Sequence, residues 1–170
     1  MKKMITSIMA ILLCATMFTA CGKNSIHTDL LDYEYNQLPP VVDLNTQIST
    51  DYASVTGANY KDDKTTMAKL KDVILPESNK EIKLAKAIVP KTKEVREVHD
   101  IYIASITEQN EAFVMLLQAL KTNNAALITP ANNKINDAIA KAKDYMAKVS
   151  ELEKKYNVHS NTTSDDTQSK

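Results

Sequence analysis

Glycine is almost missing from this chain: only Gly22 and Gly57 occur among its 170 residues, and tryptophan is absent. Glycine-rich phosphate loops, nucleophile elbows and tight hairpins need backbone positions with positive φ, which glycine adopts most readily. Two glycines cannot supply such loops, so the sequence argues against nucleotide-binding and hydrolase machinery of these kinds. The same scarcity favours a helical protein.

Cysteine is equally scarce, with Cys14 and Cys21 the only two. No cysteine follows Cys21, which excludes disulfides, thiol catalysis and cysteine metal sites from everything after it. We therefore expect the folded part to be held together by packing alone.

An excess of either charge is also lacking. The chain has 21 basic and 21 acidic side chains, and residues 1–20 contain two of the lysines and no acid. Without that segment, 19 basic side chains remain against 21 acidic ones. A balance this close to neutral gives no reason to expect nucleic acid as a partner, or strong attraction to anionic lipid.

The first residues have the features of an export signal. Two lysines follow the first methionine, and an apolar run extends from Ile8 to Phe18. This run of about 11 residues is too short to span a membrane as a helix, which takes roughly 17 to 25 residues. The small residues Thr19 and Ala20 then precede Cys21. Residues 1–20 are therefore predicted to be a signal peptide.

The sequence Phe18-Thr19-Ala20-Cys21 resembles the lipobox of bacterial lipoproteins, with Phe18 where an aliphatic residue is usual. The resemblance implies that signal peptidase II cleaves before Cys21. It also implies that Cys21 carries acyl chains, such as palmitate, that anchor the chain to the extracytoplasmic side of the cell membrane. Each buried methylene contributes about 0.8 kcal/mol, so two or three acyl chains hold firmly. An ordinary cleaved signal, or a core helix containing a cysteine, is the alternative.

Residues 21–42 are largely polar and end near two prolines, which predicts a spacer between the membrane and a folded body. The alternative is a short helix around Leu30–Tyr35 that folds back onto the body. The body is predicted at 43–156. Residues 157–170 contain no large apolar residue apart from Val158, so a disordered tail is expected there.

Apolar residues recur at steps of three and four through 43–156, the period of helices with one buried face. The first helix is predicted to run from its N-cap Asp43 to Pro76. A polar stretch around Gly57 weakens the pattern and predicts a bend or an interruption there.

The second predicted helix begins at Ser78, which stands three residues before Glu81 as in a capping box, and extends to about Leu120. Pro90 falls inside it and lacks the N–H that an interior helical position requires. We therefore expect a kink or a break just before Pro90.

The third predicted helix has the cleanest pattern, begins at Asn124 or Thr129 and ends near Tyr156. No sustained alternation of apolar and polar residues predicts a strand. Three long helices with short connections favour an all-α, antiparallel three-helix bundle about 45 Å long. The segment near Leu30 could add a short extra N-terminal helix.

His99 lies among acidic residues, which raises the possibility of a metal site. Ligands on one helical face are three or four residues apart, and His99 has Val95, Arg96, Tyr102 and Ile103 at those distances. None of these is a suitable ligand, so a solvated charged face is predicted for His99. His27 and His159 are expected at the surface. We expect no metal, no cofactor and no enzymatic activity.

Two polar residues on the second helix remain of interest. The apolar residues of this helix form one stripe along it, here called the seam, and their spacing predicts an apolar side chain at position 109, where Gln109 stands. Tyr102 lies on the same seam. Gln109 fixes the register or is exposed, or else it lines a ligand pocket with Tyr102; packing in the core is expected for Tyr102.

Signal peptide, lipobox, polar spacer and helical body together resemble the small surface lipoproteins of Gram-positive bacteria, and only the lipobox region carries specific likeness. This resemblance implies a membrane-anchored, non-enzymatic module that binds an envelope protein or a cell-wall component. The alternative is a small-ligand carrier or sensor with a pocket between the helices, near Gln109 and Tyr102.

Overall fold

The computed structural model describes residues 18–158, with side chains from residue 22 onward. All regular structure within this range is helical, which confirms the all-α class. Residues 1–17, which belong to the predicted signal peptide, and residues 159–170 of the predicted tail lie outside it. In chain order the elements are α1 (Phe18–Asp32), the π-helix η1 (Tyr33–Gln37), α2 (Pro39–Ala53), the 3-10 turn η2 (Gly57–Asn59), α3 (Asp63–Lys69), the π-helix η3 (Leu70–Ile74), α4 (Leu75–Ala87), α5 (Lys93–Thr122), the 3-10 turn η4 (Ala125–Leu127) and α6 (Ile128–Tyr156).

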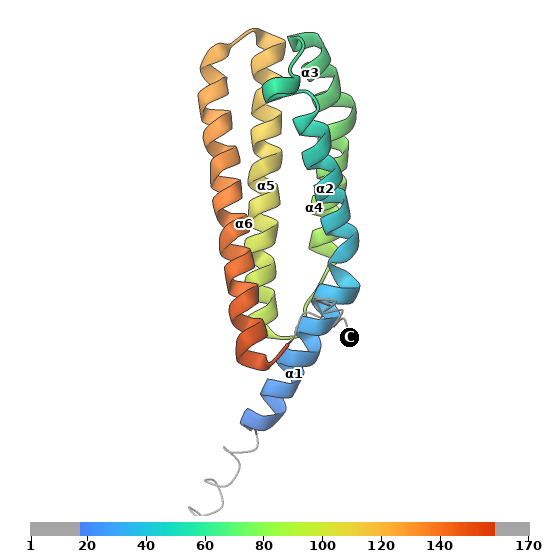
Figure 1. The fold of residues 1–170 in the computed structure, drawn as a ribbon, viewed down its shortest axis with the longest axis vertical. Coiled ribbons are helices and arrows are strands. Elements are labelled where there is room, and N and C mark those ends of the chain that lie inside the picture. The colour runs from blue at the N-terminus through green and yellow to red at the C-terminus, as the bar shows by residue number, and fades with distance from the viewer. Residues whose placement is uncertain (1–17, 159–170) are drawn as a thin grey trace, which may run out of the picture.

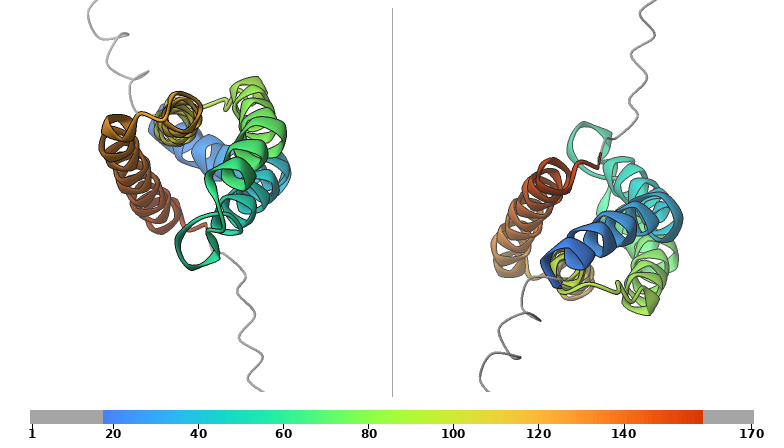
Figure 2. Two further views of the ribbon diagram at one scale, coloured as in Figure 1. Left: turned by 90° about the horizontal axis from the view of Figure 1, so that it is seen from above. Right: turned by 90° about the horizontal axis from the view of Figure 1, so that it is seen from below.

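The helices form four rods that run alternately up and down (Figure 1). The first rod consists of α1, η1 and α2, the second of α3, η3 and α4, and the third and fourth are α5 and α6. Viewed from above and below, the rods surround a shared core, and α1 crosses its base (Figure 2). The three-helix bundle expected from the sequence is therefore too simple, and three local features explain the difference.

The first feature is the segment 21–42, which is helical and packed where a spacer was predicted. Leu30, Tyr33, Leu38 and Val41 are buried in the basal core. The structure therefore agrees with the alternative, a helix that folds back onto the body. This helix extends well beyond Leu30–Tyr35. The two prolines near its end fit because they occupy the first turn of α2, where backbone N–H groups have no intrahelical acceptor.

Asp29 fastens this N-terminal helix to the rest of the bundle. Its side chain is 2 % exposed and accepts hydrogen bonds from the backbone N–H groups of Lys91 (3.0 Å) and Thr92 (2.7 Å) and from the Thr92 hydroxyl (2.6 Å). Thr92 is the N-cap of α5 but makes no capping bond with its own side chain. Asp29 therefore satisfies donors at the start of α5 from a helix more than 60 positions earlier in the chain.

The second feature is a reversal of the chain between α2 and α3, at the place where the sequence predicts a bend or an interruption. Gly57 has φ of +57° there, a conformation that side chains with a Cβ rarely adopt. Asp62 then caps α3, because its carboxylate accepts from the N–H of Thr65 at 2.7 Å. The first predicted helix is thus two antiparallel ones.

The third feature concerns two prolines with opposite effects. Pro76 does not end a helix: it lies in the first turn of α4, where proline is tolerated, and the chain continues from η3 through it. Ser78, predicted as an N-cap, is instead buried, and its hydroxyl accepts from the side-chain amide of Asn110 at 2.9 Å. At Pro90 the predicted break is confirmed, since α4 ends at Ala87 and α5 begins at Lys93.

Two apolar clusters fill the bundle. The basal cluster joins α1, η1, α2, α4 and α5 to the end of α6, and even includes Val158. The distal cluster joins α2, η3, α5 and the start of α6 around Ile48, Leu70 and Phe113. Along its length α6 packs chiefly on α5, at small residues such as Ala138, whose carbonyl accepts from the Ser105 hydroxyl at 2.8 Å.

Replacing Asp29 with alanine tests the attachment of α1. The variant removes the charged acceptor of the backbone N–H groups of Lys91 and Thr92, so we expect the free energy of unfolding to fall by about 2 kcal/mol. Urea unfolding followed by circular dichroism measures this. Asp43→Ala is the matched control, because Asp43 is exposed and should change stability little. Equal effects at both positions would show that the Asp29 contacts contribute nothing.

Candidate functional site

A polar layer crosses the middle of the bundle and contains both residues singled out from the sequence. The Glu81 carboxylate on α4 accepts from the Asn45 amide at 2.9 Å and from the Tyr102 hydroxyl at 3.2 Å. The same Asn45 amide is 3.5 Å from the side-chain oxygen of Gln109. Tyr102 is buried and Gln109 half-buried. The structure thus brings Tyr102 and Gln109 together as members of a hydrogen-bonded layer between α2, α4 and α5.

Glu81 is the unusual member of this layer. Its side chain is fully buried, and its second carboxylate oxygen, Oε2, has no hydrogen-bond partner among the described residues. Burial raises the pKa of Glu81 to about 7, and the bonds from Asn45 and Tyr102 oppose that rise. The carboxyl therefore changes its charge near neutral pH inside the bundle.

His99 belongs to a second buried layer, which shows that the solvated face predicted for it is wrong. The side chain is 3 % exposed, and burial lowers its pKa. Its Nε2–H donates to the Ala85 carbonyl at 2.9 Å, so Nδ1 is free to accept from the Tyr33 hydroxyl at 3.1 Å. The Tyr145 hydroxyl lies 3.3 Å from that of Tyr33. The sequence does contain a signal for the burial of His99, because Tyr102, which lies on the apolar seam of α5, is one helical turn away on the same face.

The described residues contain no group of three or more His, Cys, Asp or Glu side chains that could hold a metal ion. The partners are instead Asn45 and Tyr102 at Glu81, and Tyr33 and the Ala85 carbonyl at His99. What these layers can do chemically is to take up or release a proton and to fix the helices relative to one another.

A cavity of about 490 Å³ lies at the far end of the bundle from α1, and sequence reasoning did not find it. Apolar side chains of α5 and α6 form much of its wall, including Leu116, Leu120 and Ile128. Tyr52, whose ring lies 5.0 Å from that of Phe113, forms another part. The η2 turn and α3 complete the cavity with polar groups. It depends on the reversal at Gly57, where the sequence pattern predicts only a bend or an interruption within one helix.

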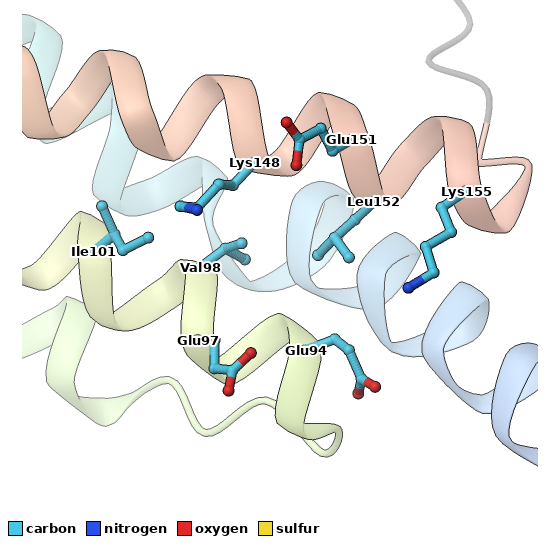
Figure 3. Close-up of a pocket in the computed structure, with 8 residues that line it drawn as sticks. All are labelled: Glu94, Glu97, Val98, Ile101, Lys148, Glu151, Leu152 and Lys155. Carbon is cyan, nitrogen blue, oxygen red and sulfur yellow. The ribbon is translucent and has the colours of Figure 1, made fainter.

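A groove of about 460 Å³, separate from the distal cavity, runs between α5 and α6 near the base. Figure 3 shows Val98 and Leu152 facing each other between the two helices. Three glutamates and two lysines surround this apolar strip: Glu94, Glu97, Glu151, Lys148 and Lys155. Because the charges are mixed, the groove does not select a ligand of either sign.

Cys21 lies in the second turn of α1, and its side chain is outside the described part. Its lipidation remains a prediction. Among the described helices, none is long and apolar enough to cross a membrane.

The buried carboxyl of Glu81 makes a pH-dependent contribution to stability. Below about pH 4.5 both folded and unfolded chains hold its proton, whereas between about pH 4.5 and 7 only the folded chain does. The contribution of Glu81 to the free energy of unfolding therefore falls as pH rises through this window. We expect Glu81→Gln to be about 3 kcal/mol more stable than the parent at about pH 8, and nearly equal at about pH 4.

Urea unfolding at a series of pH values measures the effect. Glu34 shares the window, because burial and then the nearby Glu153 raise its pKa to about 7, so part of the slope remains. Glu97→Gln is the control, since Glu97 is exposed and paired with Lys93 at 3.6 Å. A Glu81→Gln profile parallel to that of the parent would contradict the buried titration.

No protein-family model, curated protein or solved structure matches this chain. Any function assigned to it therefore depends on the geometry of its own residues.

Proposed function

We propose that this protein is a membrane-anchored, extracytoplasmic lipoprotein that acts as a non-enzymatic binding module for an envelope protein or a cell-wall component. The observation that carries the proposal is the direct continuation of the helix containing Cys21 into the packed core. Asp29, only eight positions after Cys21, is already buried and hydrogen-bonded to the start of α5. An anchor at Cys21 would therefore be attached to the bundle without a flexible spacer.

A rigid attachment gives the bundle a defined near end and far end. The α5 helix has 30 residues and is therefore about 45 Å long. The reversal at 54–62 and the turn at 123–127 lie at the opposite end from α1 (Figure 1). An anchored bundle would hold this distal end well away from the membrane, where a partner in the envelope can reach it.

The placement of the titratable groups supports a binding role over a catalytic one. Glu81 and His99, whose pKa values are shifted by burial, are enclosed between helices and engaged with neighbouring side chains. A catalytic acid or base must reach a substrate within hydrogen-bonding distance. Their enclosure supports a structural role for both.

A second candidate, a small-ligand carrier, is favoured by one observation, the distal cavity. Its volume of about 490 Å³ is within the range of small-molecule sites, and its wall combines aliphatic side chains with Tyr52, Thr56 and Asn132. This cavity lies at the end of the bundle, and neither Gln109 nor Tyr102, near which the sequence predicts a pocket, is in its lining.

Site-specific photocrosslinking in cells tests the binding module. Tyr60 at the distal end and Tyr35 near the base are both 51 % exposed, so the same photoreactive residue at either position is equally accessible. We expect position 60 to capture one specific envelope component and position 35 not to. Cys21→Ser should move the protein out of the membrane fraction and abolish capture, whereas Cys14→Ser should change neither.

Equal capture at both positions, or capture that persists without the anchor, would contradict a distal binding surface that depends on membrane attachment. Mass spectrometry identifies the captured component.

Thermal unfolding with a panel of small apolar molecules tests the carrier. A ligand at about 100-fold excess over its Kd adds about 2.7 kcal/mol to stability, which raises the melting temperature by several degrees. Asn132→Trp should fill the cavity and remove that rise. Asn133→Trp should keep it, because Asn133 is also exposed but does not line the cavity. A rise that persists in Asn132→Trp would place the ligand elsewhere.

A further inference from the structure

A third pocket, of about 420 Å³, lies at the base between α1 and the end of α6. It shares Lys155 with the groove in Figure 3, but no carboxylate residue is part of its lining. The lining residues are Lys23, Asn24 and His27 from α1 and Lys155, Tyr156 and Asn157 from the end of α6. Two lysines and two asparagines therefore line one space.

His27 is the residue that holds the two sides of this basal pocket together. Its Nδ1 lies 2.9 Å from the Tyr156 carbonyl oxygen, which can only accept, so Nδ1–H donates. Lys23 is four positions before His27 and therefore lies on the same face of α1. Lys155 directly precedes Tyr156. The contact between α1 and the end of α6 thus places two lysines that are 132 positions apart in the sequence in the lining of one pocket.

The C-terminal end of a helix normally repels anions, because its last carbonyl groups are unsatisfied. Here several of these carbonyl groups are already engaged. Asn157 adopts φ of +56°, and its N–H and that of Val158 both donate to the Glu153 carbonyl. The Tyr156 carbonyl accepts from His27. Of the side chains that remain for a ligand, the two lysines can only donate and the two asparagine amides can donate as well as accept, which suits a phosphate group.

We propose that this basal pocket binds the phosphate of an anionic phospholipid in the membrane that holds Cys21. The inference rests on the proposed anchor at Cys21. Lys23 is two positions after Cys21, and two helical residues rise only about 3 Å, so an anchored protein has Lys23 at the depth of the lipid headgroups. The whole chain is nearly neutral, so the attraction comes from this local arrangement and not from net charge. A bound headgroup gives the bundle a second point of attachment and thereby limits its tilt.

Native mass spectrometry of the full lipidated protein, extracted in mild detergent, tests the proposal. The probes are phosphatidylglycerol, phosphatidylcholine and inorganic phosphate, each titrated separately. We expect one phosphatidylglycerol to be retained in preference to phosphatidylcholine. Lys23→Gln and Lys155→Gln should each weaken retention about tenfold, the effect of losing one charge-assisted contact. Lys154→Gln is the matched control, because Lys154 is exposed and adjacent but does not line the pocket.

The same spectra separate this inference from the proposed function. If Cys21 carries its diacylglycerol mass but both pocket variants retain lipid as the parent does, the headgroup site is overturned and the anchor stands. If inorganic phosphate binds with the same dependence on the two lysines and phosphatidylglycerol does not bind, the pocket is a free-anion site and the lipid assignment fails. An unacylated Cys21 overturns the anchor and with it the membrane source of the phosphate.

Discussion

The carboxylate of Asp29 is the contact on which the arrangement of this protein depends. The connection that follows α4 contains Pro90, and the N–H groups of Lys91 and Thr92 would lose their acceptor within the protein if α1 were removed. By accepting both bonds, Asp29 fixes the path of the connection, the start of α5 and the position of α1 at once. The buried side chains of Leu30 and Tyr33 can occupy the basal core because α1 is held in this place.

The two buried polar layers make the folded state less stable than an apolar core would, but they fix how the four rods are aligned along their axes. A carboxyl at Glu81 with an unpartnered oxygen is less favourable than an apolar side chain of the same size. Its partners Asn45 and Tyr102 lie on two other rods, and the Tyr33 partner of His99 lies on the first rod. Sliding any one rod by a turn would unpair these groups. An apolar core of mostly interchangeable aliphatic residues would not impose that restriction.

The sequence could predict what depends on local chemistry. The helical class, the break at Pro90 and the end of α6 near Tyr156 all follow from residue types and spacing. Gly57 gave a signal for an interruption but not for a full reversal, because the apolar period resumes beyond it. Tyr102 and Gln109 were identifiable as polar residues on a seam. Their partners could not be identified, since Glu81 and Asn45 come from other rods, and the distal cavity exists only once those rods are assembled.

The distal cavity lies between two helical hairpins, one formed by α2 and α3 and the other by α5 and α6. Polar contacts hold each hairpin together. In the first, the Asp51 carboxylate pairs with Lys69 at 2.6 Å, and the Thr66 hydroxyl donates to the Val55 carbonyl at 3.1 Å. In the second, Lys134 of α6 pairs with Glu111 of α5 at 2.6 Å. Between the hairpins, the distal cluster contributes apolar contacts, which are not directional. A small change in hairpin spacing there breaks no hydrogen bond of either hairpin, whereas at the base it would disturb the bonds of Asp29. The distal end is therefore the part of the bundle that can adjust to a bound partner at least cost in free energy.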